Sequence, residues 1–149
     1  MRRFTLSLFA MLPVIAGAAH AQSPAAPLAS GSNSAFEAFG GESGIARIVD
    51  NGVNRLVNDD RIKARFATAN IPRLKTLLTQ QFCTLLGGGC VYQGRAMTDT
   101  HAGMELRNAD FNALAEDFQF AMDDAGVPFR YQNVLLKQLA PMQHDVVTK

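Results

Sequence analysis

Residues 92–104 read YQGRAMTDTHAGM, a stretch in which His101 stands between two methionines at helical spacing. Met97 precedes the histidine by four residues and Met104 follows it by three, so one short segment carries all three side chains. A single histidine on a helix is either an ordinary surface or core residue or a metal ligand. The choice between these interpretations depends on the sequence around the stretch.

Apolar residues recur at spacings of three and four on both sides of this stretch, which is the period of a helix with one buried face. Such stripes run through residues 45–57, 71–86, 111–122 and 134–146, and Phe36 with Phe39 indicates a shorter first helix. Glycine or proline interrupts the pattern at residues 40–41, 87–89 and 126–128. No run of alternating β-branched residues predicts a strand, so we expect an all-α domain with about five to six helices.

Three residues mark expected helix ends. Asn70 and Asn108 each precede an apolar stripe, and an asparagine side chain there accepts a hydrogen bond from the first helical turn. Pro141 lies inside the last stripe, where its missing N–H should bend or shorten the helix.

The start of the chain has the three parts of a secretory signal peptide. Arg2 and Arg3 form a basic start, residues 6–18 are an apolar run, and Ala19-His20-Ala21 has the small-x-small pattern of a cleavage site. A membrane anchor is the alternative, but the run falls short of the roughly 20 residues that cross a bilayer. We therefore predict a signal peptide over 1–21, no membrane span, and export to the periplasm or the outside of the cell.

The rest of the chain suits one compact domain after a linker. The full chain has 149 residues, 48% of them hydrophobic and 18% charged. Ten of the thirteen residues in 22–34 are Ser, Ala, Pro or Gly, a composition that buries too little apolar surface to order itself. We predict a flexible linker over 22–34 and the folded domain over 35–149.

Charge and cysteine content narrow the function further. Without Arg2 and Arg3, the 14 basic residues become 12 against 13 acidic ones, and no basic cluster is present, which argues against nucleic acid as a partner. The motifs of zinc sites, phosphate-binding loops and serine hydrolases are also missing. In an oxidising compartment Cys83 and Cys90 can form a disulfide, and two buried thiols are the alternative.

Five stretches, taken together, resemble the group 1 truncated haemoglobins in order and spacing. They cover the domain from about Phe36 to Val147, and the most specific is the Tyr-x-Gly-x-x-Met-x-x-x-His pattern. The stretches are Gly40-Gly41-Glu42-Ser43-Gly44-Ile45, Leu86-Gly87-Gly88-Gly89, Tyr92-Gln93-Gly94-Arg95-Ala96-Met97, His101-Ala102-Gly103-Met104 and Ala125-Gly126-Val127-Pro128.

The resemblance implies a shortened globin fold in which helices pack two on two around haem b. It implies that His101 is the proximal ligand to the iron and that oxygen or another diatomic gas binds opposite. The chain lacks the Cys-x-x-Cys-His signature, so the haem is expected to be non-covalent. The residues that match positions near the haem are Phe66, Leu74, Leu78, Tyr92, Arg95, Met97, His101 and Phe111. The apolar ones are otherwise core residues, and Arg95 is otherwise a solvated loop charge.

The chain departs from the family on the distal side of the haem. Val53 and Leu78 stand where many members have a tyrosine and a glutamine that bind oxygen, Leu74 occupies the gate-like position, and Gly52 replaces a common phenylalanine. The pocket over the iron is therefore expected to be dry, and oxygen to leave quickly. Thr79, Gln80 and Gln81 are alternative donors, although none aligns with a distal position.

Three functions follow from these features. The first is a haem-dependent gas binder, compatible with nitric-oxide dioxygenase chemistry and served by an unknown reductase. The second is an electron-transfer or redox-sensing haem protein, which the export signal, the apolar distal positions and the cysteine pair favour. The third is a helical interaction module that has lost its cofactor.

Overall fold

A computed structural model describes residues 31–149, so the expected signal peptide and most of the expected linker lie outside the described residues. The described elements are all helical, which confirms the all-α prediction. They are α1 (Gly31–Ala38), α2 (Gly41–Leu56), the 3-10 turn η1 (Lys63–Phe66), α3 (Ile71–Leu85), α4 (Met97–His101), α5 (Asn108–Asp124), α6 (Phe129–Leu139), the 3-10 turn η2 (Ala140–Met142) and α7 (Gln143–Val146). Within residues 31–149, none of the helices combines the length and the apolar character that a bilayer crossing requires.

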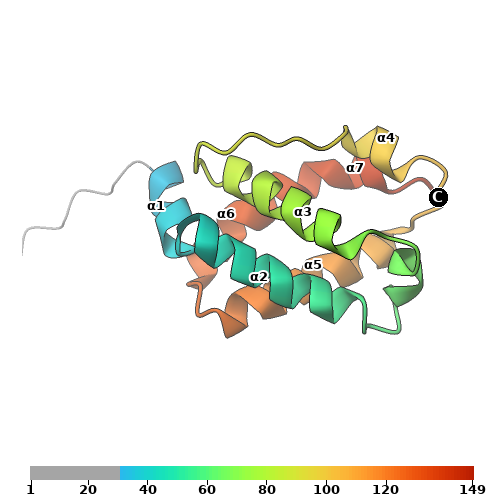
Figure 1. Ribbon diagram of the computed structural model, residues 1–149, viewed down its shortest axis with the longest axis horizontal. Helices are drawn as coiled ribbons and strands as arrows, with labels where there is room; N and C mark the ends of the chain where they lie inside the picture. The colour runs from blue at the N-terminus through green and yellow to red at the C-terminus, as the bar shows by residue number, and fades with distance from the viewer. Residues whose placement is uncertain (1–30) are drawn as a thin grey trace, which may run out of the picture.

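Four helices form two packed pairs. Helix α2 packs against both α3 and α5, and α6 contacts both α3 and α5, so the pair α2–α3 lies over the pair α5–α6 (Figure 1). The short helix α4 lies beside α7 (Figure 1). This is the two-on-two arrangement that the sequence predicts.

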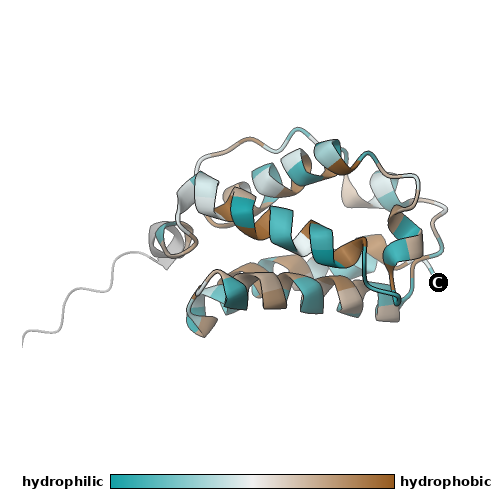
Figure 2. Cartoon of the chain, turned by 60° about the horizontal axis from the view of Figure 1, so that its bottom comes forward, coloured by the Kyte–Doolittle hydropathy of each residue, from teal (hydrophilic) through white to brown (hydrophobic). Residues whose placement is uncertain are grey.

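The core lies where the two pairs meet. Each long helix has hydrophobic and hydrophilic faces, visible as brown and teal bands in Figure 2. The rings of Phe82 on α3 and Phe118 on α5 meet edge to face, with centroids 5.0 Å apart and planes 72° apart. The largest fully buried apolar side chains come from α2, α3, α5 and α6 and from Leu86 just after α3. They are Phe82, Phe118, Ile45, Ile48, Leu56, Leu86, Met122 and Leu135.

The helix ends follow the sequence at two positions and depart from it at two. The Asn70 side chain accepts a hydrogen bond from the Arg73 N–H (3.0 Å), as predicted, and α6 ends at Leu139 just before Pro141. The prediction for Asn108 is wrong, because Asn108 is the first residue of α5 rather than its cap. The Asp110 carboxylate accepts from the Arg107 N–H (2.8 Å) instead. Helix α1 begins at Gly31, inside the stretch expected to be linker.

Candidate functional site

A cavity of about 270 Å³ lies between α3 on one side and α4, α5 and the chain from α6 to α7 on the other. Apolar side chains form most of its wall, and its polar lining residues are Gln81 and His101. The full lining is Leu78, Gln81, Phe82, Met97, His101, Phe111, Leu114, Ala115, Leu136, Leu139, Ala140, Met142 and Val146. We call this space the central cavity.

Two smaller hollows adjoin the central cavity and extend it at its ends. One, of about 120 Å³, shares Leu78, His101 and Phe111 with it and continues towards η1. The other, of about 260 Å³, shares Gln81, Met97 and Met142 with it and continues towards the loop before α4. The three spaces share lining residues and are mainly apolar, and together we call them the slot.

All eight residues predicted to surround a haem line this slot. Met97, Leu78, His101 and Phe111 line the central cavity, and Phe66 and Leu74 line the hollow towards η1. Tyr92 and Arg95 line the hollow before α4. The sequence missed Leu114, Met142 and Val146, whose apolar spacing marks a buried helix face but not which space that face borders.

The ring of His101 is fixed in one orientation by its own helix. Its Nδ1 lies 2.8 Å from the carbonyl oxygen of Met97, one turn earlier in α4. A carbonyl only accepts hydrogen bonds, so Nδ1 carries the proton and Nε2 keeps a free lone pair. This is how a metal-binding imidazole is usually held, with one nitrogen bonded to the protein and the other available to the metal.

The loop before α4 positions an aromatic ring and a cation at the edge of the slot. The Tyr92 hydroxyl donates to the carbonyl of Arg95 (3.2 Å), and burial raises the pKa of Tyr92. The ring lies so close to Gly94 that a Cβ there would stand 2.0 Å from the hydroxyl, so a side chain at position 94 would displace the Tyr92 ring. Arg95 is exposed and forms no salt bridge within residues 35–149, which leaves its charge available to an anion.

The α3 side of the slot is apolar at the positions where the family often carries donors. Leu74 and Leu78 line it, and Val53 is fully buried in the core on the neighbouring helix α2. A Cβ on Gly52 would stand only 2.4 Å from the Phe118 ring. The ring of Phe118 therefore lies against the helix backbone at Gly52, in space that a side chain at that position would occupy.

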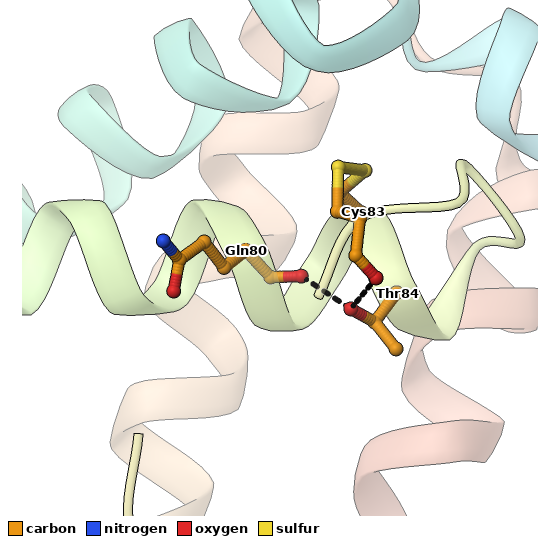
Figure 3. The surroundings of a disulfide bond; sticks show 4 residues. Gln80, Cys83 and Thr84 are labelled. Carbon is orange, nitrogen blue, oxygen red and sulfur yellow. Dashed lines mark hydrogen bonds between the residues drawn. A yellow bond between two sulfur atoms is a disulfide. The ribbon is translucent and has the colours of Figure 1, made fainter. Parts of the chain in front are cut away.

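A disulfide joins α3 to the loop that leads to α4. Cys83 and Cys90 are bonded with their Cα atoms 5.7 Å apart, which confirms the pairing that the sequence left open. Thr84 donates to the Cys90 carbonyl (2.9 Å) as well as to the Gln80 carbonyl (2.8 Å), as Figure 3 shows. The Gln93 N–H donates to the Gln80 side chain (3.1 Å). The loop is thus held along α3 by one covalent bond and two hydrogen bonds.

An ion pair lines the η1 end of the slot. Arg65 of η1 and Asp110 of α5 both line the hollow there, and their Nη2 and Oδ2 atoms lie 3.2 Å apart. Burial is the largest single influence on the pKa of the Asp110 carboxyl, and on its own it would raise that pKa. The hydrogen bonds from the Arg107 N–H and from Arg65 outweigh it together, so the pKa lies below its usual value.

The protein itself offers few metal ligands. Across residues 31–149, no three His, Cys, Asp or Glu side chains gather as a metal-binding group. An iron ion held at His101 would therefore need a cofactor to supply its remaining ligands, and the apolar slot around the imidazole fits a flat, hydrophobic macrocycle.

Comparison with known sequences gives one consistent family. The profile of the bacterial-like globins matches residues 34–148. A group 1 truncated haemoglobin from Tetrahymena pyriformis is 28% identical over 114 residues, which cover 76% of this chain and 94% of that protein. One from Synechocystis sp. is 33% identical over 101 residues, covering 62% of this chain and 78% of that protein.

Solved structures agree. The crystal structure of the Tetrahymena pyriformis truncated haemoglobin in its Fe(III) form is 28% identical and has a TM-score of 0.74, covering 77% of this chain and 98% of that one. The 2/2 haemoglobin of a Synechococcus species, determined with covalently attached haem, covers the same shares with a TM-score of 0.70. It is 20% identical, so this second likeness shows the fold alone.

Proposed function

Because the chain belongs to the bacterial-like globin family, as a truncated haemoglobin of group 1, we propose that His101 is the proximal ligand of haem b in the slot. A protein of this family binds haem and a gas ligand. We further propose that oxygen or another diatomic gas binds on the α3 side, opposite His101, while the iron is ferrous.

The orientation of the His101 ring carries this proposal. The hydrogen bond from Nδ1 to the Met97 carbonyl (2.8 Å) leaves Nε2 as the free nitrogen, and His101 lines both the central cavity and the hollow towards η1. Bound haem would supply a reducible iron that can take a gas ligand. The chain supplies the imidazole, the apolar walls that exclude water, and Arg95 with Tyr92 as partners for the propionates.

We propose that the haem is held without a covalent bond. Both cysteines are used in the disulfide, and the exposed His144 lines a separate hollow with Asn108 and Gln143. Neither the thiols nor this second imidazole is therefore placed to add to a haem vinyl group. This arrangement supports retention by burial, by the His101 bond and by the propionate partners, without a covalent link to the porphyrin.

The apolar distal positions also fit a spacing in the Tetrahymena pyriformis protein. Its structures include variants of one tyrosine and of two glutamines that lie 21 and 25 residues further along that chain. Leu74 and Leu78 follow Val53 at the same two spacings here. This match supports assigning Val53, Leu74 and Leu78 to the distal side.

Export remains part of the proposal. Residues 1–21 have the pattern of a signal peptide, and a disulfide between Cys83 and Cys90 is typical of oxidising compartments such as the periplasm. Gas binding there, with nitric-oxide dioxygenase turnover, would need a reductase to return ferric iron to the ferrous form. An exported electron carrier is the second candidate, favoured by the disulfide and by the apolar Leu74 and Leu78.

Absorption spectra test the proposal directly. Purified protein supplied with haem should show a Soret band, which His101→Ala should abolish or strongly shift, whereas the matched control His144→Ala should leave it unchanged. Carbon monoxide should shift the ferrous spectrum of a gas binder and leave that of a six-coordinate electron carrier unchanged. A wild-type protein that stays colourless would refute both haem functions and leave the interaction module.

A further inference from the structure

One amide side chain faces the slot from the α3 side. Gln81 lies one helical turn after Leu78 and is only 9% exposed. It lines the central cavity together with His101, which comes from the opposite wall, and it also lines the hollow before α4. A buried amide in an apolar wall requires an explanation, because burying it without a good hydrogen bond costs stability.

The protein gives the Gln81 amide only weak partners. Its Nε2 lies 3.5 Å from the Met142 sulfur and 3.7 Å from the Met97 sulfur, and a thioether is a poor acceptor. Both methionines line the same cavity, so these contacts lie across the slot rather than within α3. The amide hydrogens can turn to a stronger acceptor in the cavity at little cost.

Thr79 and Gln80, the two polar residues that precede Gln81, already form hydrogen bonds outside the slot. The Thr79 hydroxyl donates to the Lys75 carbonyl (2.9 Å). The Gln80 side chain accepts from the Gln93 N–H (3.1 Å) and borders a polar surface hollow with Arg73 and Thr76. Of the three alternative donors, Gln81 is the one that lines the slot.

We propose that Gln81 donates a hydrogen bond to the gas ligand and so replaces the donors that Val53 and Leu78 do not provide. The inference rests on the proposed function. Oxygen gains negative charge when it binds ferrous haem, whereas carbon monoxide gains much less, so an N–H donor slows the release of oxygen selectively. Gln81 thereby determines which gas this otherwise apolar slot retains.

The test compares Gln81→Leu and Gln81→Met with the control Thr79→Val, which removes a polar side chain that bonds within α3, in haem-loaded protein. We expect both Gln81 variants to release oxygen at least about tenfold faster, with a smaller change for carbon monoxide. The infrared C–O stretching frequency of the carbon monoxide complex should rise in both, because a donor near the ligand oxygen is lost. Thr79→Val should change neither quantity.

Two further measurements separate the possible outcomes. If the wild type forms no haem complex, the proposed function fails. If it forms one but the oxygen release rate and the C–O stretch stay unchanged in both Gln81 variants, the role of Gln81 is wrong and haem binding stands. In haem-free protein, Gln81→Met should raise the melting temperature by removing a weakly bonded buried amide; such a rise with unchanged ligand data marks a merely structural residue.

Discussion

The two sides of the slot are built in different ways. On the proximal side, which is α4 with the loop 86–96, the His101 ring is fixed by the Met97 carbonyl, and the loop is held by the Cys83–Cys90 disulfide. The distal side, which is the inner face of α3, presents Leu74, Leu78 and the single amide of Gln81.

The two sides suit two different requirements, one for holding a metal ligand and one for interacting with a gas ligand. A metal ligand must keep one orientation, and α4 is only five residues long, so its position depends on bonds made by the loop before it. A gas ligand is affected by whichever donor lies near it, and an apolar wall lets one side chain dominate. Changes on the proximal side should therefore affect haem retention, and changes on the distal side should affect ligand release.

The largest effect is expected from opening the disulfide. In Cys83→Ser/Cys90→Ser, the loop of about eight residues loses its covalent closure, which the chain-entropy model values at about 2.5 kcal/mol. The free energy of unfolding from a denaturant titration should fall by about this amount, and haem should transfer faster to a competing apoprotein. Oxygen release should change little.

Reduced wild type provides the matched control for that experiment, because it should behave like the double variant. A double variant that keeps its haem as firmly as the oxidised wild type would contradict the role given to the loop. The Thr84 and Gln80 hydrogen bonds would then be sufficient to hold it.

The second effect concerns the core behind the distal side. Gly52→Ala would place a Cβ about 2.4 Å from the fully buried Phe118 ring, so the ring must move. Overpacking of this kind exceeds the gain in helix propensity, and we expect a net loss of about 2 kcal/mol in the free energy of unfolding. Thermal or chemical denaturation of the haem-free protein measures it.

Replacing Phe118 by a smaller side chain should relieve the destabilisation caused by Gly52→Ala. In the Phe118→Leu background, Gly52→Ala should cost much less, because the atoms that clash are gone. Equal costs in both backgrounds would show that Gly52 is kept for another reason than the approach of Phe118.

The sequence predicts the fold well because its helix signals are local. The apolar period, the Asn70 cap and the break at Pro141 all appear where expected. The prediction that Asn108 caps α5 is wrong for two reasons. The Asp110 carboxylate caps the helix instead, and the Asn108 side chain accepts a hydrogen bond from Gln143 of α7 (2.7 Å). That second contact joins residues far apart in sequence, which local patterns do not reveal.

The residues of the site divide in the same way, into those that the sequence predicts and those that depend on tertiary packing. The eight predicted lining residues all border the slot because the resemblance fixes their register along the helices. Gln81 could not be separated from Thr79 and Gln80 by sequence, since all three are polar residues of one helical turn. Only burial and hydrogen-bond partners distinguish them, and both depend on how α3 packs against α4 and η2.

A third prediction adds a second donor to the distal side. Leu78 borders both the central cavity and the hollow towards η1, and glutamine has nearly its volume. Leu78→Gln should slow oxygen release about tenfold, roughly 1.5 kcal/mol, because the new amide bonds the charged ligand. Stopped-flow replacement of oxygen by carbon monoxide measures this rate. Faster release in Leu78→Gln would place Leu78 away from the ligand.

The smallest effect is expected at the η1 end of the slot, outside both sides. Asp110 caps α5 and pairs with Arg65, and Asp110→Asn keeps an acceptor for the cap but loses the charge. We expect a loss of about 1 kcal/mol in the free energy of unfolding at pH 7. The pKa of Asp110 is lowered in the folded state, so its carboxylate stabilises the fold above the unfolded pKa of 3.8.

That stabilisation must therefore disappear as the pH falls through the lowered pKa, and the wild type and Asp110→Asn should converge below pH 3.8. Urea titrations at a series of pH values measure the convergence, and Arg65→Gln with the double variant isolates the ion pair. If the wild type and Asp110→Asn still differ in their free energy of unfolding in acid, the carboxyl acts through its shape rather than its charge. Ligand release should remain unchanged throughout, because the pair lies at the η1 end of the slot, between η1 and α5, and belongs to neither the proximal nor the distal side.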